Sequence, residues 1–474
     1  MSERGPGAPR MAVLGLDLGT TEAKAALVGL DGTLYGLGRA AIPTFHGPDG
    51  RAEQDPRDWW RAIASATRSI EALGGEEVVV AAICGVGQGP TLAVLDGDAE
   101  PTRAAITWQD RRIGGVGWGL LPKIAWLADN DLDAAAEARW LLASWDALGL
   151  WLTGEAAQTL QGHEAAMGAR DLEAAGVRRA QTGDPLPFGT PLGALRADAA
   201  SALGIRPGIP VVAGVNDGTA SMLGAGLLVA GDAVDTGGTS GGIGIYADRE
   251  VAIPGLFVAP APLPGRWVVG GAMASTGAAV DWIRGVTGGD WSGDELFAAA
   301  AAVPAGADGL VFLPYLAGER APVFDEQARG AFVGLTLQHG RAHLARAVIE
   351  GAAYSLRHIA EPLAAAGAPV RELRLAGRAS HDDTWAQIKA DVLGVPVAIP
   401  VIGHTAVLGA AILAAAGTGL VSDLEAGVVA MTAVDRRIEP DPAVRARYDD
   451  LFDVYRSLYP ALAPSMHALG TGGD

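Results

Sequence analysis

The segment Leu14-Gly-Leu-Asp17-Leu-Gly19-Thr20-Thr21-Glu-Ala-Lys24 gives the strongest indication of the fold that we expect for this chain. It indicates a β-strand, a tight turn of glycine and hydroxyl residues, and a second strand through Val28. An acid and two hydroxyls at such a hairpin tip suit a metal-bound phosphate, because glycine allows close backbone approach and the hydroxyls and N–H groups donate to phosphate oxygens. The acid, Asp17, can hold magnesium directly or through water. The spacing is not a Walker loop, and an ordinary hairpin turn is the alternative.

The segment from Gly231 to Tyr246 repeats this pattern in the opposite half of the chain. Asp235 is followed by glycines and hydroxyls, among them Gly238 and Thr239, and then by a second apolar strand. Self-similarity at this separation predicts a duplicated fold with two phosphate hairpins that face each other across a cleft. The pattern resembles the superfamily of sugar kinases, Hsp70 and actin, whose two related domains clamp a nucleotide between such hairpins.

The composition limits the class of protein and its partners. With 474 residues, of which 49% are hydrophobic and 19% charged, the chain is long enough for two or three domains with a large core. Its net charge of −19 argues against a nucleic-acid partner, which needs clustered lysine and arginine. An anionic substrate such as ATP must then be held by local donors and a cation, because bulk attraction is absent.

The sequence gives no sign of a disulfide framework or of a membrane. The single cysteine, Cys84, excludes a disulfide within the chain and indicates a small buried residue. The first ten residues lack the apolar core of a signal peptide, and no apolar run reaches the ~20 residues of a membrane span. The longest candidate, 407–416, indicates a buried helix. We therefore expect a soluble, cytoplasmic protein without a membrane partner.

Strand and helix patterns alternate through both halves of the chain. Asp55 and Pro56 suit the start of a helix, as cap and first-turn residue. Strands are expected at 78–83, 91–95, 209–213, 267–269, 373–375 and 397–399, and helices at 217–228, around Trp282, at 343–366 and at 383–393. The expected division is a disordered tail at 1–10, an N-terminal domain at 11–228, a C-terminal domain at 229–463 and a tail at 464–474.

Longer motifs are more specific than the hairpins. Gly330-Ala-Phe-Val-Gly-Leu335, seven residues, then His343-Leu-Ala-Arg-Ala-Val-Ile-Glu350 fit the C-terminal signature of the FGGY carbohydrate kinases, and the segments 53–60, 108–112 and 391–397 are also typical of that family. The resemblance spans about Ala12 to Gly419. It implies an α/β fold of two ribonuclease-H-like, actin-like ATPase domains that flank a nucleotide and sugar cleft. It also implies ATP-dependent phosphorylation of a sugar or polyol hydroxyl, with Mg2+.

Asp217 is the expected catalytic base. It lies where a strand ends and a helix begins, an edge at which parallel sheets bind ligands. A sugar hydroxyl is a poor nucleophile, and a carboxylate can orient it and accept its proton as the phosphoryl group moves. The resemblance places the family's base at this Gly-x-x-Asp position, and a plain helix cap is the alternative reading of the same residue.

The resemblance also implies the nucleotide-binding residues. Asp17 is expected on magnesium, and the ATP contacts are expected from Thr20, Thr21, Lys24, Gly238, Thr239, Gly377 and Ser380. Lys24 occupies the place of a family basic residue that can reach the γ-phosphate, with a solvated strand lysine as the alternative. Gly377 and Ser380 match the glycine turn beside adenine and ribose.

The sugar pocket is expected from Gln88, Trp108 and Asp110, together with Asp217. A tryptophan face can lie on sugar C–H bonds, and a carboxylate can accept sugar hydroxyls. The segment 87–91 lacks the Arg-Glu pair of glycerol kinases and the Met-His of typical xylulokinases, but the chain keeps their Gln and their Trp-x-Asp-x-Arg. These features favour a ketopentose, with another ketose or a polyol as the alternative.

Two segments are shorter than in the family pattern, 113–122 and 159–180. Both regions normally wall the sugar or form dimer contacts, so a wider pocket, a larger substrate or a changed oligomer is expected, with a homodimer as one possible assembly. They also motivate a rival function, a degenerate kinase that senses nucleotide or sugar. A chaperone- or actin-like ATPase is a second rival, although that class lacks the FGGY signature.

Overall fold

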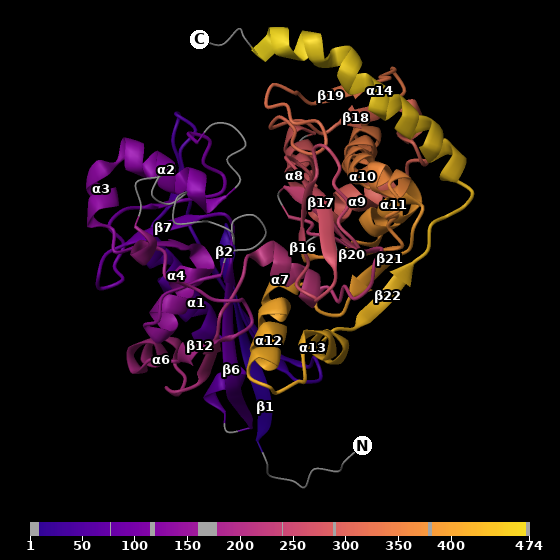
Figure 1. Cartoon of the computed structure of the whole chain (residues 1–474). Coiled ribbons are helices and arrows are strands. Elements are labelled where there is room, and N and C mark those ends of the chain that lie inside the picture. Colours follow the sequence, from indigo (N-terminus) through magenta and orange to yellow (C-terminus); the bar gives the residue numbers. More distant parts are fainter. Residues whose placement is uncertain are drawn as a thin grey trace. The chain divides into compact units, whose positions relative to one another are not determined.

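The computed structural model describes residues 9–75, 77–113, 119–159, 178–238, 240–287, 291–377 and 382–470. The chain divides into two compact units (Figure 1). The first unit comprises Met1–Gly226 and His404–Thr432, and the second comprises Leu227–Gly403 and Ala433–Asp474. Within the described residues, no helix is long and apolar enough to cross a bilayer.

A six-stranded sheet forms the centre of the first unit, in the order β12-β13-β6-β1-β2-β3. Strands β1, β6 and β13 run parallel, whereas β2 pairs antiparallel with both β1 and β3, and β12 pairs antiparallel with β13. The strands are β1 Arg10–Leu18, β2 Glu22–Gly29, β3 Leu34–Ala41, β6 Val78–Gly87, β12 Pro191–Ala194 and β13 Pro210–Val212. The predicted first hairpin, β1 and β2, is confirmed.

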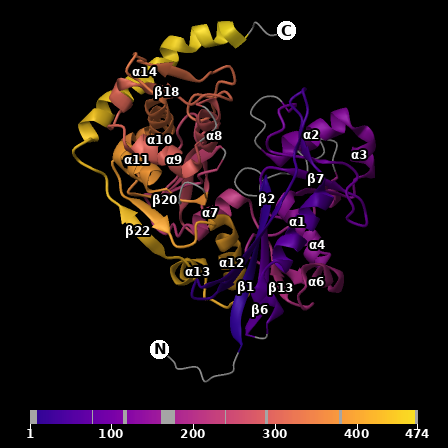
Figure 2. The same ribbon diagram turned by 180° about the vertical axis from the view of Figure 1, so that it is seen from behind.

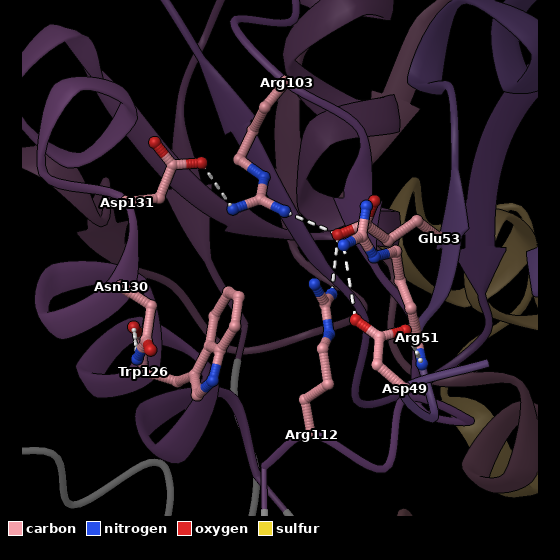
Figure 3. Close-up of a pocket in the computed structure, with 8 residues that line it drawn as sticks. All are labelled: Asp49, Arg51, Glu53, Arg103, Arg112, Trp126, Asn130 and Asp131. Carbon is pink, nitrogen blue, oxygen red and sulfur yellow. Dashed lines mark hydrogen bonds and ion pairs between the residues drawn. The ribbon is translucent and has the colours of Figure 1, made fainter. Parts of the chain in front are cut away.

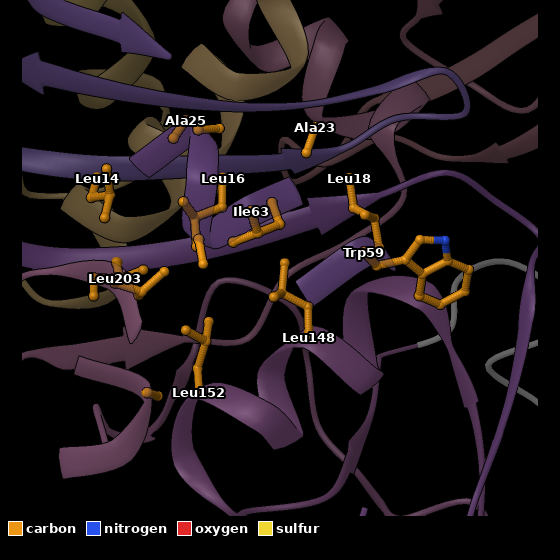
Figure 4. Packing of buried hydrophobic residues seen from close by; sticks show 14 of the residues in the cluster. Leu14, Leu16, Leu18, Ala23, Ala25, Trp59, Ile63, Leu148, Leu152 and Leu203 are labelled. Atoms are coloured by element: carbon orange, nitrogen blue, oxygen red, sulfur yellow. The ribbon is translucent and has the colours of Figure 1, made fainter. Parts of the chain in front are cut away.

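The even-numbered side chains of β1 build the main core of this unit. Leu14, Leu16 and Leu18 are fully buried in one apolar cluster with residues of α1 (Pro56–Arg68) and α4 (Ser144–Thr153), as Figure 4 shows. Burial of each leucine stabilises the unit by about 1.5–3 kcal/mol. Because side chains alternate along a strand, the odd-numbered residues face the other way.

The opposite face of β1 is covered by α12 (Thr405–Gly417), which comes from late in the sequence and lies beside β1 in Figures 1 and 2. A Cβ on Gly15 would meet the carbonyl oxygen of Val407 at 2.2 Å, so only glycine allows this helix backbone to lie directly on the strand. The sequence predicted one boundary at 228/229, but the chain returns to the first unit at 404–432. An apolar helix pattern indicates that a helix is buried but not which strand it packs against. The sequence therefore did not predict that 404–432 belongs to the first unit.

A smaller sheet and several helices complete the first unit. The sheet has the order β4-β5-β8-β7-β9. Its strands are β4 Phe45–His46, β5 Ala52–Gln54, β7 Leu92–Leu95, β8 Ala105–Ile106 and β9 Trp140–Ala143. The other elements are α2 Leu120–Asn130, α3 Leu132–Glu137, β10 Ala157–Gln158, β11 Asp184–Pro185, α6 Ala197–Leu203, α7 Asp217–Gly224 and α13 Leu424–Met431. Helix α7 is shorter than the predicted 217–228.

The second unit has a seven-stranded sheet in the order β16-β17-β15-β14-β20-β21-β22. The strands are β14 Asp232–Asp235, β15 Gly241–Ala247, β16 Phe257–Pro260, β17 Trp267–Met273, β20 Glu372–Leu375, β21 Val397–Pro400 and β22 Val434–Ile438. The helices are α8 Gly277–Val286, α9 Gly293–Ala301, α10 Arg341–Ala365, α11 Asp383–Leu393 and α14 Arg445–Gly470, and β18 Val311–Leu313 pairs with β19 Ala331–Val333.

The two large sheets repeat one plan. In each, an antiparallel hairpin has a third antiparallel strand on one side and two parallel strands on the other: β3-β2-β1-β6-β13 in the first unit and β17-β15-β14-β20-β21 in the second. This order confirms the predicted duplication within an α/β fold.

The ends of the chain differ from the predicted tails in one respect. Residues 1–8 lie outside the described residues. At the other end, α14 continues through 464–470, where a tail was predicted, and its Met466 is buried in the core of the second unit. Pro460 and Pro464 lie inside this helix and lower its helical propensity, so the sequence alone indicated an earlier end.

Candidate functional site

Three parallel strands of the first unit end side by side and bring the predicted residues to one edge. The backbone N–H of Gln88, just after β6, donates to the Leu18 carbonyl at the end of β1 (2.8 Å). The N–H of Gly87 donates to the Val215 carbonyl (3.2 Å), two residues before Asp217. The hairpin tip, Gln88 and Asp217 therefore share the carboxyl edge of this sheet, where parallel sheets bind ligands.

Asp17 is a buried acid with a free oxygen. Its Oδ2 lies 3.5 Å from the Lys24 ammonium, and its Oδ1 is buried without a hydrogen-bond partner among the described residues. Burial raises the pKa of Asp17 above its usual range, although Lys24 acts in the opposite sense. An unpartnered buried carboxylate oxygen suits a hard cation such as Mg2+, which prefers oxygen ligands and keeps several waters. No cluster of three or more acids, histidines or cysteines occurs among the described residues to offer another metal site.

Lys24 bridges two acids on the hairpin. Its ammonium lies 3.5 Å from Asp17 and 3.2 Å from Glu22, and its side chain is 18% exposed. Burial lowers the pKa of Lys24, but the attraction of the two carboxylates is larger and raises it. Lys24 is therefore an ion-paired residue and not the solvated lysine of the alternative; its contact with the γ-phosphate stays a prediction.

Asp217 is the first residue of α7 and not its cap. Asn216 caps the helix, because its side chain accepts the N–H of Thr219 (2.8 Å). The half-buried Asp217 accepts the N–H of its neighbour Gly218 (2.9 Å). Burial, and after it the nearby charge of Asp17, raises the pKa of Asp217 to about 7. A carboxyl that titrates near neutral pH is suited to accept a proton.

Two tryptophans and two glutamines link the hairpin tip to this edge. The Trp108 indole N–H donates to the Thr20 hydroxyl (2.9 Å), so Trp108 is held against the phosphate hairpin. Gln54, which was not predicted as a site residue, bonds to Trp59, Gln88 and the Thr20 carbonyl. A sequence signal for Gln54 existed, because it lies in the Glu-Gln-Asp-Pro segment, but that segment was interpreted only as a helix start and a family mark.

Asp110, which was predicted as a sugar contact, is bound by its own loop. Its side chain is fully buried, and its oxygens accept from the Ala52 N–H (3.1 Å) and from the Arg112 backbone and guanidinium. These bonds hold the pKa of Asp110 below its usual range against the opposing effect of burial. With its carboxylate bound by Ala52 and Arg112, Asp110 positions its own loop, which includes Trp108. Its contact with sugar hydroxyls stays a prediction.

A charged pocket of about 360 Å3 lies beside this loop (Figure 3). It is lined by Asp49, Arg51, Glu53, Arg103, Arg112, Trp126, Asn130 and Asp131. Glu53 accepts from Arg103 and Arg112 at 2.6 Å each, and the Arg112 guanidinium lies 4.5 Å from the centroid of the Trp126 ring. Because Glu53 and Gln54 are successive strand residues, the pocket faces away from Gln54. The charges of its lining residues neutralise one another, so we assign these residues a structural role that stabilises the small sheet.

The second predicted phosphate loop follows β14 in the second unit. Asp235 Oδ2 pairs with the buried ammonium of Lys389 on α11 at 2.5 Å, and Oδ1 accepts the N–H of Gly237 (3.0 Å). Gly377 has φ +60°, and a Cβ there would lie 3.6 Å from the Gly237 carbonyl oxygen, so the glycine turn adjoins the loop. Gly238 in this loop is half-buried, and its carbonyl accepts the N–H of Gly277 at the start of α8 (3.3 Å).

Several predicted residues remain without structural test. Thr239 and Ser380 lie outside the described residues, as do 114–118 and 160–177 of the two shortened segments. Thr21 is exposed at the hairpin tip.

Lys389 was not predicted, since a lysine within an apolar helix pattern gives no sign of a buried partner.

Comparisons with known proteins agree with this arrangement. Residues 12–117 match the N-terminal domain and residues 233–418 the C-terminal domain of the FGGY family of carbohydrate kinases. Xylulose kinase of Escherichia coli is 30% identical, over 96% of this chain and 99% of that protein, and gluconokinase of Bacillus subtilis is 27% identical, over 87% and 89%. The crystal structure of xylulose kinase from Rhodospirillum rubrum has a TM-score of 0.84 and 30% identity, covering 96% of this chain and 100% of that one.

Proposed function

Because the chain belongs to the FGGY family of carbohydrate kinases, we propose that it transfers the γ-phosphoryl group of ATP to a hydroxyl of a ketopentose. The relatives named xylulose kinase, which match over 96% of the chain, support this substrate class. The gluconokinase relative makes an aldonate the second candidate. The observation that carries the proposal is Asp217, a carboxyl with a pKa of about 7 beside Asp17 at the edge of the sheet.

Asp217 acts as the base in this proposal. It orients the sugar hydroxyl and accepts its proton as the oxygen forms a bond to the γ-phosphorus. The bond from that phosphorus to the β–γ bridging oxygen breaks, and ADP leaves with the electron pair. At pH 7 and above, Asp217 is increasingly ionised, which is the state that the step requires.

Asp17 would hold Mg2+ through its free Oδ1, either directly or through water. Mg2+ held there would supply positive charge to neutralise the phosphate oxygens. Thr20 and Thr21 supply hydroxyl and N–H donors at the hairpin tip, and Lys24 supplies positive charge. Gly238 and Gly377, with Thr239 and Ser380, complete the proposed nucleotide contacts.

Gln88 and Trp108 are the proposed sugar contacts, together with Asp217. Gln88 has a buried amide oxygen without a partner among the described residues. Trp108 is half-buried, and the bond from its indole N–H to Thr20 holds the ring next to the hairpin tip. A homodimer and a cytoplasmic location stay predictions.

A coupled ADP-release assay tests the function. We expect turnover with Mg2+, ATP and one pentulose from a panel of pentuloses, hexuloses, polyols and aldonates. Asp217→Asn should lower kcat by about a hundredfold to ten-thousandfold, the usual contribution of a general base. Asp198→Asn is the matched control, because Asp198 is an exposed acid whose bonds are local, to the Arg196 guanidinium and the Ala199 N–H, and it should leave turnover unchanged. ATP binding without turnover on any member of the panel would favour the sensor instead.

A further inference from the structure

We propose that Trp59 and Gln54 fix the orientation of the Gln88 amide so that its oxygen, and not its NH2 group, is left for the sugar. This oxygen would favour a substrate that donates a neutral hydroxyl there over an acid that presents a carboxylate. The inference rests on the proposed function, because it assigns Gln88 to the substrate. It names Trp59 and Gln54 as positioning residues for specificity.

The orientation of Gln54 follows from two groups that each have a single hydrogen-bonding role. The Trp59 indole N–H can only donate, and it lies 2.7 Å from one end of the Gln54 amide, which must therefore be the oxygen. The Thr20 carbonyl can only accept, and it lies 2.6 Å from the other end, which must be the NH2 group. That NH2 group also donates to the Thr44 hydroxyl (2.7 Å). Exchange of the two ends would break both fixed bonds.

The orientation of Gln88 follows from that of Gln54. The Gln54 oxygen lies 2.7 Å from one end of the Gln88 amide, and because it is an acceptor, that end must be the NH2 group. The Gly19 carbonyl, a second acceptor, lies 3.4 Å from the same end. The Gln88 oxygen is then the end that faces away from this chain of bonds.

The Gln88 oxygen is buried and has no hydrogen-bond partner among the described residues. A buried acceptor without a donor is unfavourable, so a ligand or water that donates to it is stabilised. Gln88 follows β6 at the same sheet edge as Asp17, whose free oxygen is also only an acceptor. Two acceptors at one edge suit a donor-rich polyol and a cation, whereas a carboxylate offers no donor and adds like charge near Asp17.

The hydrogen bonds that run from Trp59 through Gln54 to Gln88 form a buried relay. Its burial and its full set of bonds explain why each amide keeps a single orientation. Gln54 is 2% exposed, Gln88 and Trp59 are fully buried, and Trp59 lies in the main apolar cluster (Figure 4). The Gln54 amide uses both of its donors and both lone pairs of its oxygen. Leucine at position 54 would remove all four bonds, whereas a protonated glutamic acid would keep an oxygen for Trp59 and Gln88 and an O–H for Thr20.

The test compares Gln54→Leu with Gln54→Glu, its matched control, at saturating MgATP. Xylulose and gluconate are the two probes, and kcat/KM is measured for each, or an inhibition constant where gluconate is not turned over. We expect Gln54→Leu to raise KM for xylulose about tenfold. The ratio of kcat/KM for xylulose to that for gluconate should fall about tenfold, which corresponds to roughly the net contribution of one hydrogen bond. KM for ATP should stay within about twofold in both variants. Gln54→Glu should remain within about threefold of the wild type for both sugars.

Two further measurements keep the outcome decisive. Gln88→Met removes the proposed oxygen at the sheet edge, and it should raise KM for xylulose as Gln54→Leu does, even if Gln54→Leu fails to fold. Thermal melting measures the folded fraction of each variant. A purely structural effect would lower the folded fraction and kcat together, but it would leave the preference for xylulose over gluconate unaltered. An unchanged preference in Gln54→Leu and Gln88→Met, or a wild type that prefers gluconate, overturns the relay. A wild type that phosphorylates no sugar overturns the proposed function instead.

Discussion

The two predicted phosphate hairpins share one sequence pattern, but their acids have different partners. In the first unit, Asp17 keeps one oxygen free, and its partner Lys24 lies 3.5 Å away and is partly exposed. In the second unit, both oxygens of Asp235 are occupied, by Lys389 at 2.5 Å and by the N–H of Gly237. One copy of the pattern can therefore accept a cation, while the other is closed by a buried ion pair. A repeated motif predicts repeated backbone geometry, but the partner that folding brings to each acid decides its role.

Replacing each acid by its amide should give the largest contrast in activity. Asp17→Asn removes the charge that would hold Mg2+, and we expect kcat/KM to fall about a thousandfold, by analogy with loss of one electrostatic contact at a reacting phosphate or oxyanion. Asp235→Asn should lower it less than about tenfold once the folded fraction is taken into account. Steady-state assays across a Mg2+ titration measure both. Equal losses in the two variants would show that the hairpins do not differ as described.

Stability should show the reverse contrast. Asp235→Asn leaves the buried Lys389 charge without its partner, and we expect a loss of about 3–5 kcal/mol in the free energy of unfolding. Asp17→Asn should change it by less than about 1 kcal/mol, because Lys24 keeps Glu22. Urea unfolding measures these values. The double variant Asp235→Leu with Lys389→Met should regain most of the loss, since apolar residues can replace a buried ion pair; failure to do so would give the pair a role beyond charge balance.

The pH dependence should report the charged surroundings of the first hairpin. The pKa of Asp217 is raised from 3.8 to about 7, so kcat/KM should fall about tenfold for each pH unit below 7. Stability has the opposite sign: the native state holds this proton more tightly, so the contribution of Asp217 favours folding below pH 3.8 and is lost as the pH rises through about 7. A pH–rate profile from pH 5 to 9 checks the first statement. A flat profile would remove Asp217 as the base.

The smallest expected effect concerns the two glycines at the turns. A Cβ on Gly19 would meet the Glu22 carbonyl oxygen at 2.8 Å, whereas a Cβ on Gly238 would meet the Ser240 carbonyl oxygen at 3.2 Å. We therefore expect Gly19→Ala to lower the free energy of unfolding by about 1 kcal/mol and Gly238→Ala by less than about half of that. Urea unfolding curves of the two variants, compared with the wild type, measure the difference. A larger loss for Gly238→Ala would mean that the second turn is the tighter one.

Much of the fold could be predicted because local patterns carry it. Alternation in β1, the start of α1 at Pro56 with Asp55 as cap, and the apolar stripe of α10 all have short-range physical causes. Partners distant in sequence were not visible. The return of 404–432 to the first unit and the pairing of Asp235 with Lys389 depend on contacts that no local pattern contains.

The candidate site shows the same limit at the level of single residues. Asp217 was predicted from its place between strand and helix, and its alternative as a cap is excluded by the neighbouring Asn216. Asp110 was predicted as a sugar ligand because an acid near Trp108 suits one, and the sequence did not indicate that Arg112 and the Ala52 N–H bind its carboxylate. Gln54 was not predicted as a site residue, because a single glutamine produces no periodic sequence pattern. Its role depends on four hydrogen bonds to residues that only the folded structure brings together.

The covering of β1 by α12 has a consequence for how the polypeptide matures on the ribosome. Gly15 belongs to the first strand made, but the helix that rests on it is synthesised almost four hundred residues later. A nascent or recombinant fragment that stops at Gly226 would expose one apolar side of its central sheet to solvent and to other chains. We therefore expect either half to be poorly soluble when it is expressed alone. Moving the chain termini by circular permutation would keep β1 and α12 together, whereas truncation separates them.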